Sequence, residues 1–205
     1  VKIKKEAVTI VTQVVVSQND PAFENPTKPI GAFFTEEEII KHARIYGWKY
    51  INDSGRGYRR VVPSPKPISI VEISCIETLL DNNFVVIACG GGGIPVIEKN
   101  GEYFGCEAVI DKDAASSLLA KSLNADLFVI STAVDYAYIN YKTEEEEMIK
   151  EIKVSKLKEY LVKGHFGKGS MEPKIKACIE FTEFTGHRSV ITSPSNIYDS
   201  VKGLR

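Results

Sequence analysis

Short apolar runs alternate with segments of helical periodicity along most of the chain. The apolar runs are rich in β-branched residues and predict buried strands at residues 8–16, 84–90, 127–132 and 188–193. Apolar residues at helical spacing predict helices at residues 69–82, 113–124, 155–163 and 172–185. Strands and helices that alternate in this way indicate an α/β fold, in which helices cover both faces of a mainly parallel sheet.

A different pattern interrupts this alternation. Residues 17–34 are rich in proline and predict an irregular ordered loop. A helix is expected to begin after Thr35, which forms a capping-box sequence with Glu38, and to end at Gly47. Short strands around a glycine turn and a proline-rich connector follow. Residues 18–67 therefore predict a small subdomain inserted into a single α/β domain that spans residues 1–205.

Shorter patterns predict further elements. Asn100-Gly101 is a strong turn dipeptide and predicts a hairpin within residues 95–110. The acidic run from Glu144 to Glu147 predicts a solvated helix start, because carboxylates suit the positive end of a helix dipole. A strand at 137–141 and a short helix at 195–201 are also expected.

Composition narrows the functional classes. The chain has 205 residues, of which 43% are hydrophobic and 26% charged, as expected of a globular domain with a core. A formal net charge of −1 gives no overall attraction to nucleic acid or an anionic membrane. We expect no membrane span, because no apolar run reaches about 18 residues, and no secretory leader, because no charged-then-apolar segment with a small-residue cleavage site opens the sequence. Scattered histidines and cysteines without C-x-x-C spacing predict no zinc site and reduced, cytosolic thiols.

A run of four glycines follows the predicted strand at 84–90. Glycine is entropically costly in regular structure, but it lets backbone N–H groups approach a ligand without a Cβ in the way. A nest of such donors suits an anionic oxygen. The run is rigidified by Pro95, which favours this interpretation over a flexible loop, and it matches neither the Rossmann nor the P-loop spacing. Its members are Gly90, Gly91, Gly92 and Gly93.

Two lysines occupy predicted helix starts. Lys112 and Asp113 open the helix at 113–124, and Lys174 lies in the first turn of the helix at 172–185. Asp113 taken alone is equally well explained as a helix cap. A lysine at this end opposes the helix dipole unless an anion lies between them, so the repeated arrangement predicts a phosphate site. At ~4 Å, each ammonium group would give an anion about 4 kcal/mol of gross attraction at an effective dielectric near ~20.

The strand at 127–132 runs into small residues followed by an acid and an aromatic. These residues, Ala133, Val134, Asp135 and Tyr136, are of types that can line a flat base and a ribose. From their identity alone, an ordinary strand end explains them more simply.

Five motifs, taken together, resemble those of the carbamate kinase family, within the amino-acid kinase superfamily. They are NPTKPIG (25–31), GGGGIPV (90–96), EAVIDKD (107–113), TAVDYAYIN (132–140) and GHF-x-x-GSM-x-PK (164–174). The resemblance implies a three-layer α/β/α sandwich with a protruding subdomain, in a cytoplasmic homodimer. The implied reaction is reversible phosphoryl transfer between ATP and carbamate, giving ADP and carbamoyl phosphate, with Mg²⁺ accompanying the nucleotide. In arginine fermentation it makes ATP from carbamoyl phosphate.

The resemblance also implies residue roles. Lys174 would hold the transferred phosphoryl group or the leaving phosphate, Lys112 would neutralise charge at the same group, and Asp113 would orient both lysines. Lys28 would close over carbamate from the protruding subdomain. The carbamate end would rest on the glycine turn of Gly90, Gly91, Gly92 and Gly93, with N–H bonds from Gly91 and Gly92. The nucleotide pocket would comprise Ala133, Val134, Asp135, Tyr136, His165, Gly169 and Met171, and no residue is assigned as a metal ligand.

The chain also departs from the family pattern. Cys89 stands where serine is frequent, and Gly167-Lys168 stand where Ala-Pro is common. Family members carry a strand and a GGNAL turn ahead of the position that matches Val1, and a last strand after Gly203, so we expect a shortened form of the family. Two alternatives stay open: another amino-acid kinase that forms an acylphosphate, and a non-catalytic fragment that binds nucleotide.

Overall fold

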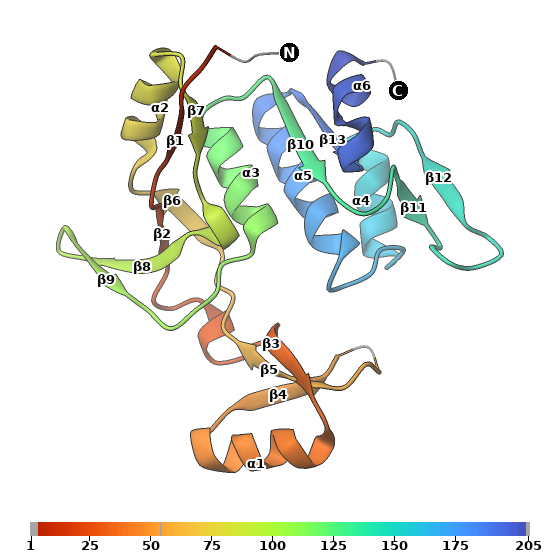
Figure 1. Cartoon of the computed structure of the whole chain (residues 1–205). Helices are drawn as coiled ribbons and strands as arrows, with labels where there is room; N and C mark the ends of the chain where they lie inside the picture. Colours follow the sequence, from red (N-terminus) through yellow and green to blue (C-terminus); the bar gives the residue numbers. More distant parts are fainter. Residues whose placement is uncertain (1–3, 54, 204–205) are drawn as a thin grey trace. The chain divides into compact units, whose positions relative to one another are not determined.

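The computed structural model describes residues 4–53 and 55–203, which fall into two compact units (Figure 1). The first unit contains the described residues up to Val8, the segment Ile73–Val86 and the chain from Lys112 onwards. The second unit contains Thr9–Glu72 and Ile87–Asp111. The chain passes from one unit to the other between Asp111 and Lys112, inside one of the motifs singled out above.

A four-stranded sheet of order β6-β2-β8-β9 forms the core of the second unit. Strand β2 (Gln13–Val16) pairs in parallel with β8 (Ile94–Lys99) and antiparallel with β6 (Pro67–Ile70). β8 continues through the predicted Asn100-Gly101 turn into β9 (Glu102–Gly105). The buried side chains of this sheet include Val14, Val16 and Val96.

The same unit carries a second, three-stranded sheet of order β3-β5-β4, with one helix packed against it (Figure 1). Its strands are β3 (Lys28–Phe34), β4 (Lys49–Asn52) and β5 (Tyr58–Val62). Helix α1 (Glu36–Tyr46) begins at the Thr35–Glu38 capping box and ends at Gly47 in the left-handed conformation, as the sequence predicts. A 3₁₀ turn, η1 (Pro21–Phe23), precedes this sheet.

Helices dominate the first unit, where α3 (Lys112–Ser122), α4 (Val154–Val162) and α5 (Met171–Thr185) pack together. Strand β10 (Leu127–Ser131) pairs in parallel with β13 (Arg188–Thr192), and β11 (Ala137–Ile139) pairs antiparallel with β12 (Glu147–Ile149). The remaining helical elements are α2 (Ile73–Asp81), η2 (Gly90–Gly92, in the second unit), η3 (Pro194–Asn196) and α6 (Ile197–Lys202). Strand β1 (Ala7–Thr9) pairs with β7 (Val85–Ile87).

The α/β class is confirmed, and four local predictions need correction. The expected strand at 8–16 is two strands, the expected loop at 17–34 contains β3, and the expected helix at 69–82 starts only after β6. The run Glu144–Glu147 does not start a helix, because it leads into β12. Strands β2 and β3 pair with β6 and β5, which are distant in sequence, and a local pattern cannot show such pairing. Strand β12 instead forms a hairpin with the preceding strand β11, which the acidic run does not indicate. In the described part of the chain, no helix is both long and apolar enough to cross a membrane.

Candidate functional site

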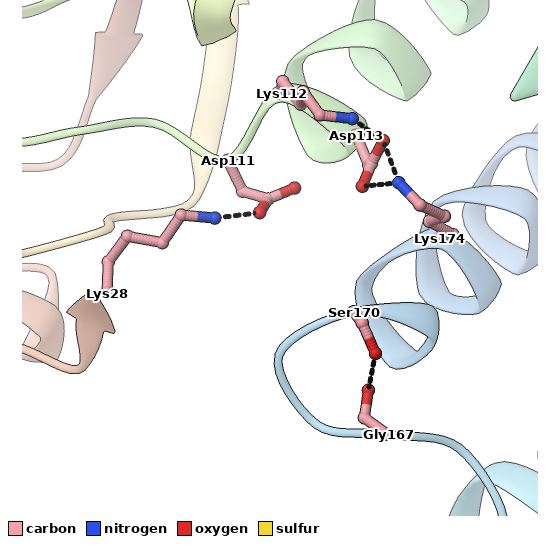
Figure 2. Close-up of polar contacts among 7 residues, drawn as sticks. All are labelled: Lys28, Asp111, Lys112, Asp113, Gly167, Ser170 and Lys174. Carbon is pink, nitrogen blue, oxygen red and sulfur yellow. Dashed lines mark hydrogen bonds and ion pairs between the residues drawn. The ribbon is translucent and has the colours of Figure 1, made fainter. Parts of the chain in front are cut away.

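A buried carboxylate holds two lysines at the start of α3 (Figure 2). Asp113 Oδ2 accepts a hydrogen bond from Lys174 Nζ at 2.9 Å, and Asp113 Oδ1 accepts one from Lys112 Nζ at 3.0 Å. The Asp113 and Lys174 side chains are 10% and 12% exposed, whereas the Lys112 side chain is 60% exposed. Two lysines expected at separate helix starts are thus brought to one carboxylate, and one of them faces solvent.

The packing of α3 against α5 explains this meeting. Asp113 is the second residue of α3 and Lys174 the fourth residue of α5. One turn further along, the fully buried Ser117 hydroxyl donates to the Ala177 carbonyl at 2.9 Å. Small residues such as Ala115 line the buried face of α3 and allow the two helices to approach closely. The register of the two helices therefore places Asp113 beside Lys174.

A second ion pair lies in the other unit. Lys28 Nζ, at the start of β3, pairs with the Asp111 carboxylate (Figure 2). The two side chains are partly exposed. Asp111 directly precedes Lys112 in the chain and is the last residue of the second unit within this motif. The sequence indicated Lys28 as a candidate but gave no signal for its acidic partner, which lies 83 residues away.

The glycine run forms a tight turn, and its glycines are needed for different reasons. Gly91, Gly92 and Gly93 have φ angles of 67°, 112° and 81°, which favour glycine. A Cβ on Gly92 would lie 2.3 Å from the Ile110 carbonyl oxygen, and one on Gly93 would lie 2.6 Å from a Val14 methyl. Close approach to the chain's own backbone and side chains therefore requires Gly92 and Gly93, whatever ligand the turn binds.

The amides of this turn are also partly engaged. The Gly92 N–H donates to the Cys89 carbonyl at 2.9 Å, and the Gly93 N–H donates to the Gly90 carbonyl at 3.2 Å. The expected bond from the Gly92 amide to a ligand stays a prediction, and in this conformation that amide already has a partner within the turn. Gly90 and Gly91 remain the candidates for that contact.

Cys89 begins the turn in a strained conformation. Its φ of 53° and ψ of 31° are left-handed, which costs a residue with a Cβ roughly 1–2 kcal/mol. The side chain is buried, and burial, assisted by the Glu72 charge, raises the pKa of the thiol from 9.0 to about 11. Cys89 is therefore a protonated, enclosed thiol in this structure and not an accessible nucleophile.

The candidate nucleotide segment borders a cavity in the first unit. Ala133, Val134, Asp135 and Tyr136 connect β10 to β11, and the last two line a cavity of about 580 Å³. Its walls combine apolar side chains such as Ile152 and Ile175 with polar ones such as Thr182 and Arg188. This volume is within the range of small-molecule pockets.

The other predicted nucleotide residues lie around the start of α5. Met171 is the first residue of this helix and packs against the buried cluster that includes Ile175. Gly169 is exposed in the preceding loop. His165 Nδ1 lies 2.7 Å from Asn140 Oδ1, and its ring packs edge-on against Tyr160. None of these three lines the cavity, so Asp135 and Tyr136 are the members of the predicted nucleotide set that do.

Comparisons with known proteins agree with these motifs. The sequence model of the amino acid kinase family matches residues 3–193. The chain belongs to the amino acid kinase family. Its relatives include carbamate kinase 2 of Staphylococcus epidermidis, at 52% identity, and the carbamate kinase of Thermococcus kodakarensis, at 50%. Each match covers 98% of this chain but only 65% and 64% of the relative, so the chain spans less than two thirds of their length.

Solved structures of the same family share the fold. Carbamate kinase from Giardia lamblia bound to AMP-PNP is 49% identical with a TM-score of 0.86, over 97% of this chain and 63% of that one. The form of that enzyme bound to citric acid gives a TM-score of 0.90 at 48% identity, over 97% of this chain and 62% of that one. The resemblance drawn from the motifs is confirmed, and this amino acid kinase has the fold of its carbamate kinase relatives.

Sequence reasoning missed the residues that support this candidate site. Thr12 bonds to the glycine turn, Glu72 bonds to Gln13 next to Thr12, and Ser117 bonds to α5, but none belongs to a recognisable motif. A single hydroxyl or carboxyl residue carries no local signal, so only the structure reveals them. Among the described residues, no group of three or more histidine, cysteine or acidic side chains is placed to hold a metal ion.

Proposed function

We propose that this chain carries the phosphoryl-transfer machinery of a carbamate kinase. The observation that carries the proposal is the buried Asp113 carboxylate, bonded to Lys174 at 2.9 Å and Lys112 at 3.0 Å. The relatives named carbamate kinase, which are 52% and 50% identical to this chain, support the same assignment. The reaction would transfer a phosphoryl group reversibly between ATP and carbamate, giving ADP and carbamoyl phosphate.

Charge accounts for the catalytic part of this proposal. Phosphoryl transfer requires little covalent chemistry from the protein and depends on positioning and charge stabilisation. Lys174 would contact the transferred group, and Lys112, which is largely exposed, would neutralise the same charge. Asp113 carries one negative charge against two positive ones, so the trio keeps a net positive charge that attracts an anion.

The carbamate end would be bound by the second unit. Gly90 and Gly91 would donate backbone N–H bonds to its oxygens, and the Lys28 ammonium group would pair with its negative charge. In this structure Lys28 pairs with Asp111, whose carboxylate resembles carbamate in charge and shape. Carbamate would therefore take the place of the Asp111 carboxylate as the partner of Lys28.

The nucleotide would be bound in the first unit. Asp135 and Tyr136, which line the cavity, would contact the base and ribose, with Ala133, Val134, His165, Gly169 and Met171 around them. Mg²⁺ would arrive with the nucleotide phosphates and supply charge neutralisation, because the described residues offer no cluster of three ligands of their own. A cytoplasmic homodimer and ATP synthesis in arginine breakdown complete the proposal.

Substitution of Lys174 tests the proposal. We expect Lys174→Ala to lower kcat for ATP formation from carbamoyl phosphate, ADP and Mg²⁺ by about 100-fold or more, because a transition-state charge contact is lost. The control is Lys176→Ala, which removes a lysine of the same helix whose exposed side chain pairs with Glu172. Turnover by Lys174→Ala at the rate of the Lys176→Ala control contradicts the role.

Two further measurements separate the alternatives. ATP formation from other acylphosphates, at a rate above that from carbamoyl phosphate, would favour another amino-acid kinase. Absence of turnover by the unmodified chain, with calorimetric binding of Mg-ADP retained, would favour a non-catalytic nucleotide-binding chain.

A further inference from the structure

The Thr12 hydroxyl connects β2 to the glycine turn. Thr12 is 3% exposed and lies just before β2. Its Oγ1 donates to the Ile10 carbonyl at 3.0 Å and accepts from the Cys89 N–H at 2.9 Å. Its own carbonyl accepts from the Ile94 N–H at 2.8 Å. One residue therefore holds the chain immediately before and immediately after the run of four glycines.

The bond to Cys89 fixes the first peptide of the turn. Cys89 has a left-handed backbone that its Cβ disfavours, so the surrounding structure must hold it there. Its carbonyl in turn accepts from the Gly92 N–H. If Cys89 left this conformation, the amides of Gly90 and Gly91 would change direction.

We propose that Thr12 is a positioning residue, which holds the glycine turn in the shape that binds the anionic end of the substrate. This inference rests on the proposed function for the identity of the anion, carbamate or carbamoyl phosphate. It needs no such support for the claim that the Thr12 hydroxyl fixes the turn. Thr12 contacts the turn, so any effect on substrate passes through Cys89.

Thr12→Val tests the role, because valine has nearly the shape of threonine but lacks the hydroxyl. The buried Cys89 N–H loses its partner, and the turn is expected to relax. We expect KM for carbamoyl phosphate to rise about tenfold, while KM for ADP stays unchanged. A general disruption of the fold would change KM for both substrates, so a rise in KM for carbamoyl phosphate alone identifies a positioning role.

Two variants probe the same contact from either side. Thr12→Ser keeps the hydroxyl and is expected to restore most of the affinity for carbamoyl phosphate. Cys89→Gly removes the Cβ that disfavours the left-handed backbone, so it is expected to suppress part of the effect of Thr12→Val. A KM in the double variant as high as in Thr12→Val contradicts the role given to Cys89 strain.

The chain offers a matched control in Thr185. Its hydroxyl also makes two backbone bonds, since it donates to the Phe181 carbonyl at 2.9 Å and accepts from the His187 N–H at 3.1 Å. Thr185 ends α5 in the other unit. Thr185→Val is therefore expected to leave KM for carbamoyl phosphate at the wild-type value. A rise equal to that in Thr12→Val overturns the specific role of Thr12.

Amide hydrogen exchange decides the structural claim without any activity. Thr12→Val is expected to speed exchange about tenfold at the Cys89 and Gly92 N–H groups. The Ile94 N–H bonds to the Thr12 backbone carbonyl and should keep its protection. Unchanged exchange at Cys89 overturns the inference even if the chain is an active kinase. Faster exchange with unchanged KM overturns the link to substrate, and an inactive wild-type chain would fault the proposed function alone.

If Thr12→Val folds poorly, Thr12→Ala removes the same hydroxyl with a smaller side chain, and the same comparisons apply.

Discussion

Neutralising Asp113 is expected to destabilise the fold markedly. Asp113→Asn keeps the shape but removes the charge that faces Lys174, and both side chains are almost fully enclosed. Loss of one partner from a buried ion pair costs about 3–5 kcal/mol, because the other charge stays buried without compensation. Lys112 contributes little to this figure, since its side chain is 60% exposed and exposed pairs are worth about 0–1 kcal/mol.

The measurement is urea unfolding at neutral pH, together with thermal melting. We expect the free energy of unfolding to fall by about 3 kcal/mol and Tm to fall by about 6–12 °C for a chain of this size. Lys112→Ala serves as the control and is expected to change the free energy of unfolding by less than about 1 kcal/mol.

Removing the second charge distinguishes burial from packing. Asp113→Asn combined with Lys174→Met replaces the buried cation with an apolar side chain of similar length, and we expect much of the lost stability to return. If Asp113→Asn and Lys112→Ala destabilise equally, or if the double variant recovers nothing, the claim that Lys174 depends on Asp113 for its burial is wrong.

Two other predictions concern the glycine turn and a buried thiol. Gly92→Ala should lower the free energy of unfolding by at least about 2 kcal/mol, because its Cβ would meet the Ile110 carbonyl. Gly90→Ala places its Cβ in open space and should lower the free energy of unfolding by about 1 kcal/mol or less. Equal urea midpoints for the two variants would contradict this prediction. Burial raises the pKa of the Cys178 thiol from 9.0 to about 11, so its contribution to stability is complete below pH 9 and is lost as the pH rises toward 11, by about 2–3 kcal/mol. Urea unfolding of wild type and Cys178→Ala across this pH range should show the steeper decline in wild type, and parallel curves would count against it.

Elements with local signals could be predicted closely from the sequence. Helix α1 begins and ends where the capping box at Thr35 and Gly47 indicate, and the Asn100-Gly101 turn joins β8 to β9. The sequence pattern does not predict strand β3, because Pro29 within it favours a loop. In the structure β3 is an edge strand of its sheet, where a proline is tolerated because it needs no ladder hydrogen bond on the open side.

The charged residues of the candidate site could also be predicted from the sequence, but the residues that hold them in place could not. Helix starts and glycine runs carry local patterns, so Lys112, Lys174 and the glycine turn could be found. That Asp113 contacts both lysines depends on how α3 packs against α5, which no local pattern records. Thr12 and Asp111 act through contacts with residues that are distant in sequence, and such contacts appear only in three dimensions.

If Lys28 binds the substrate as proposed, its pairing with Asp111 has a consequence for which molecules can bind. Because both side chains are partly open to water, the pair is weak and Lys28 can exchange its partner for another anion. A neutral molecule offers Lys28 nothing in return for the carboxylate it would displace. Under the proposed function, discrimination against uncharged analogues of the substrate would therefore begin at this exchange, before any group has been transferred.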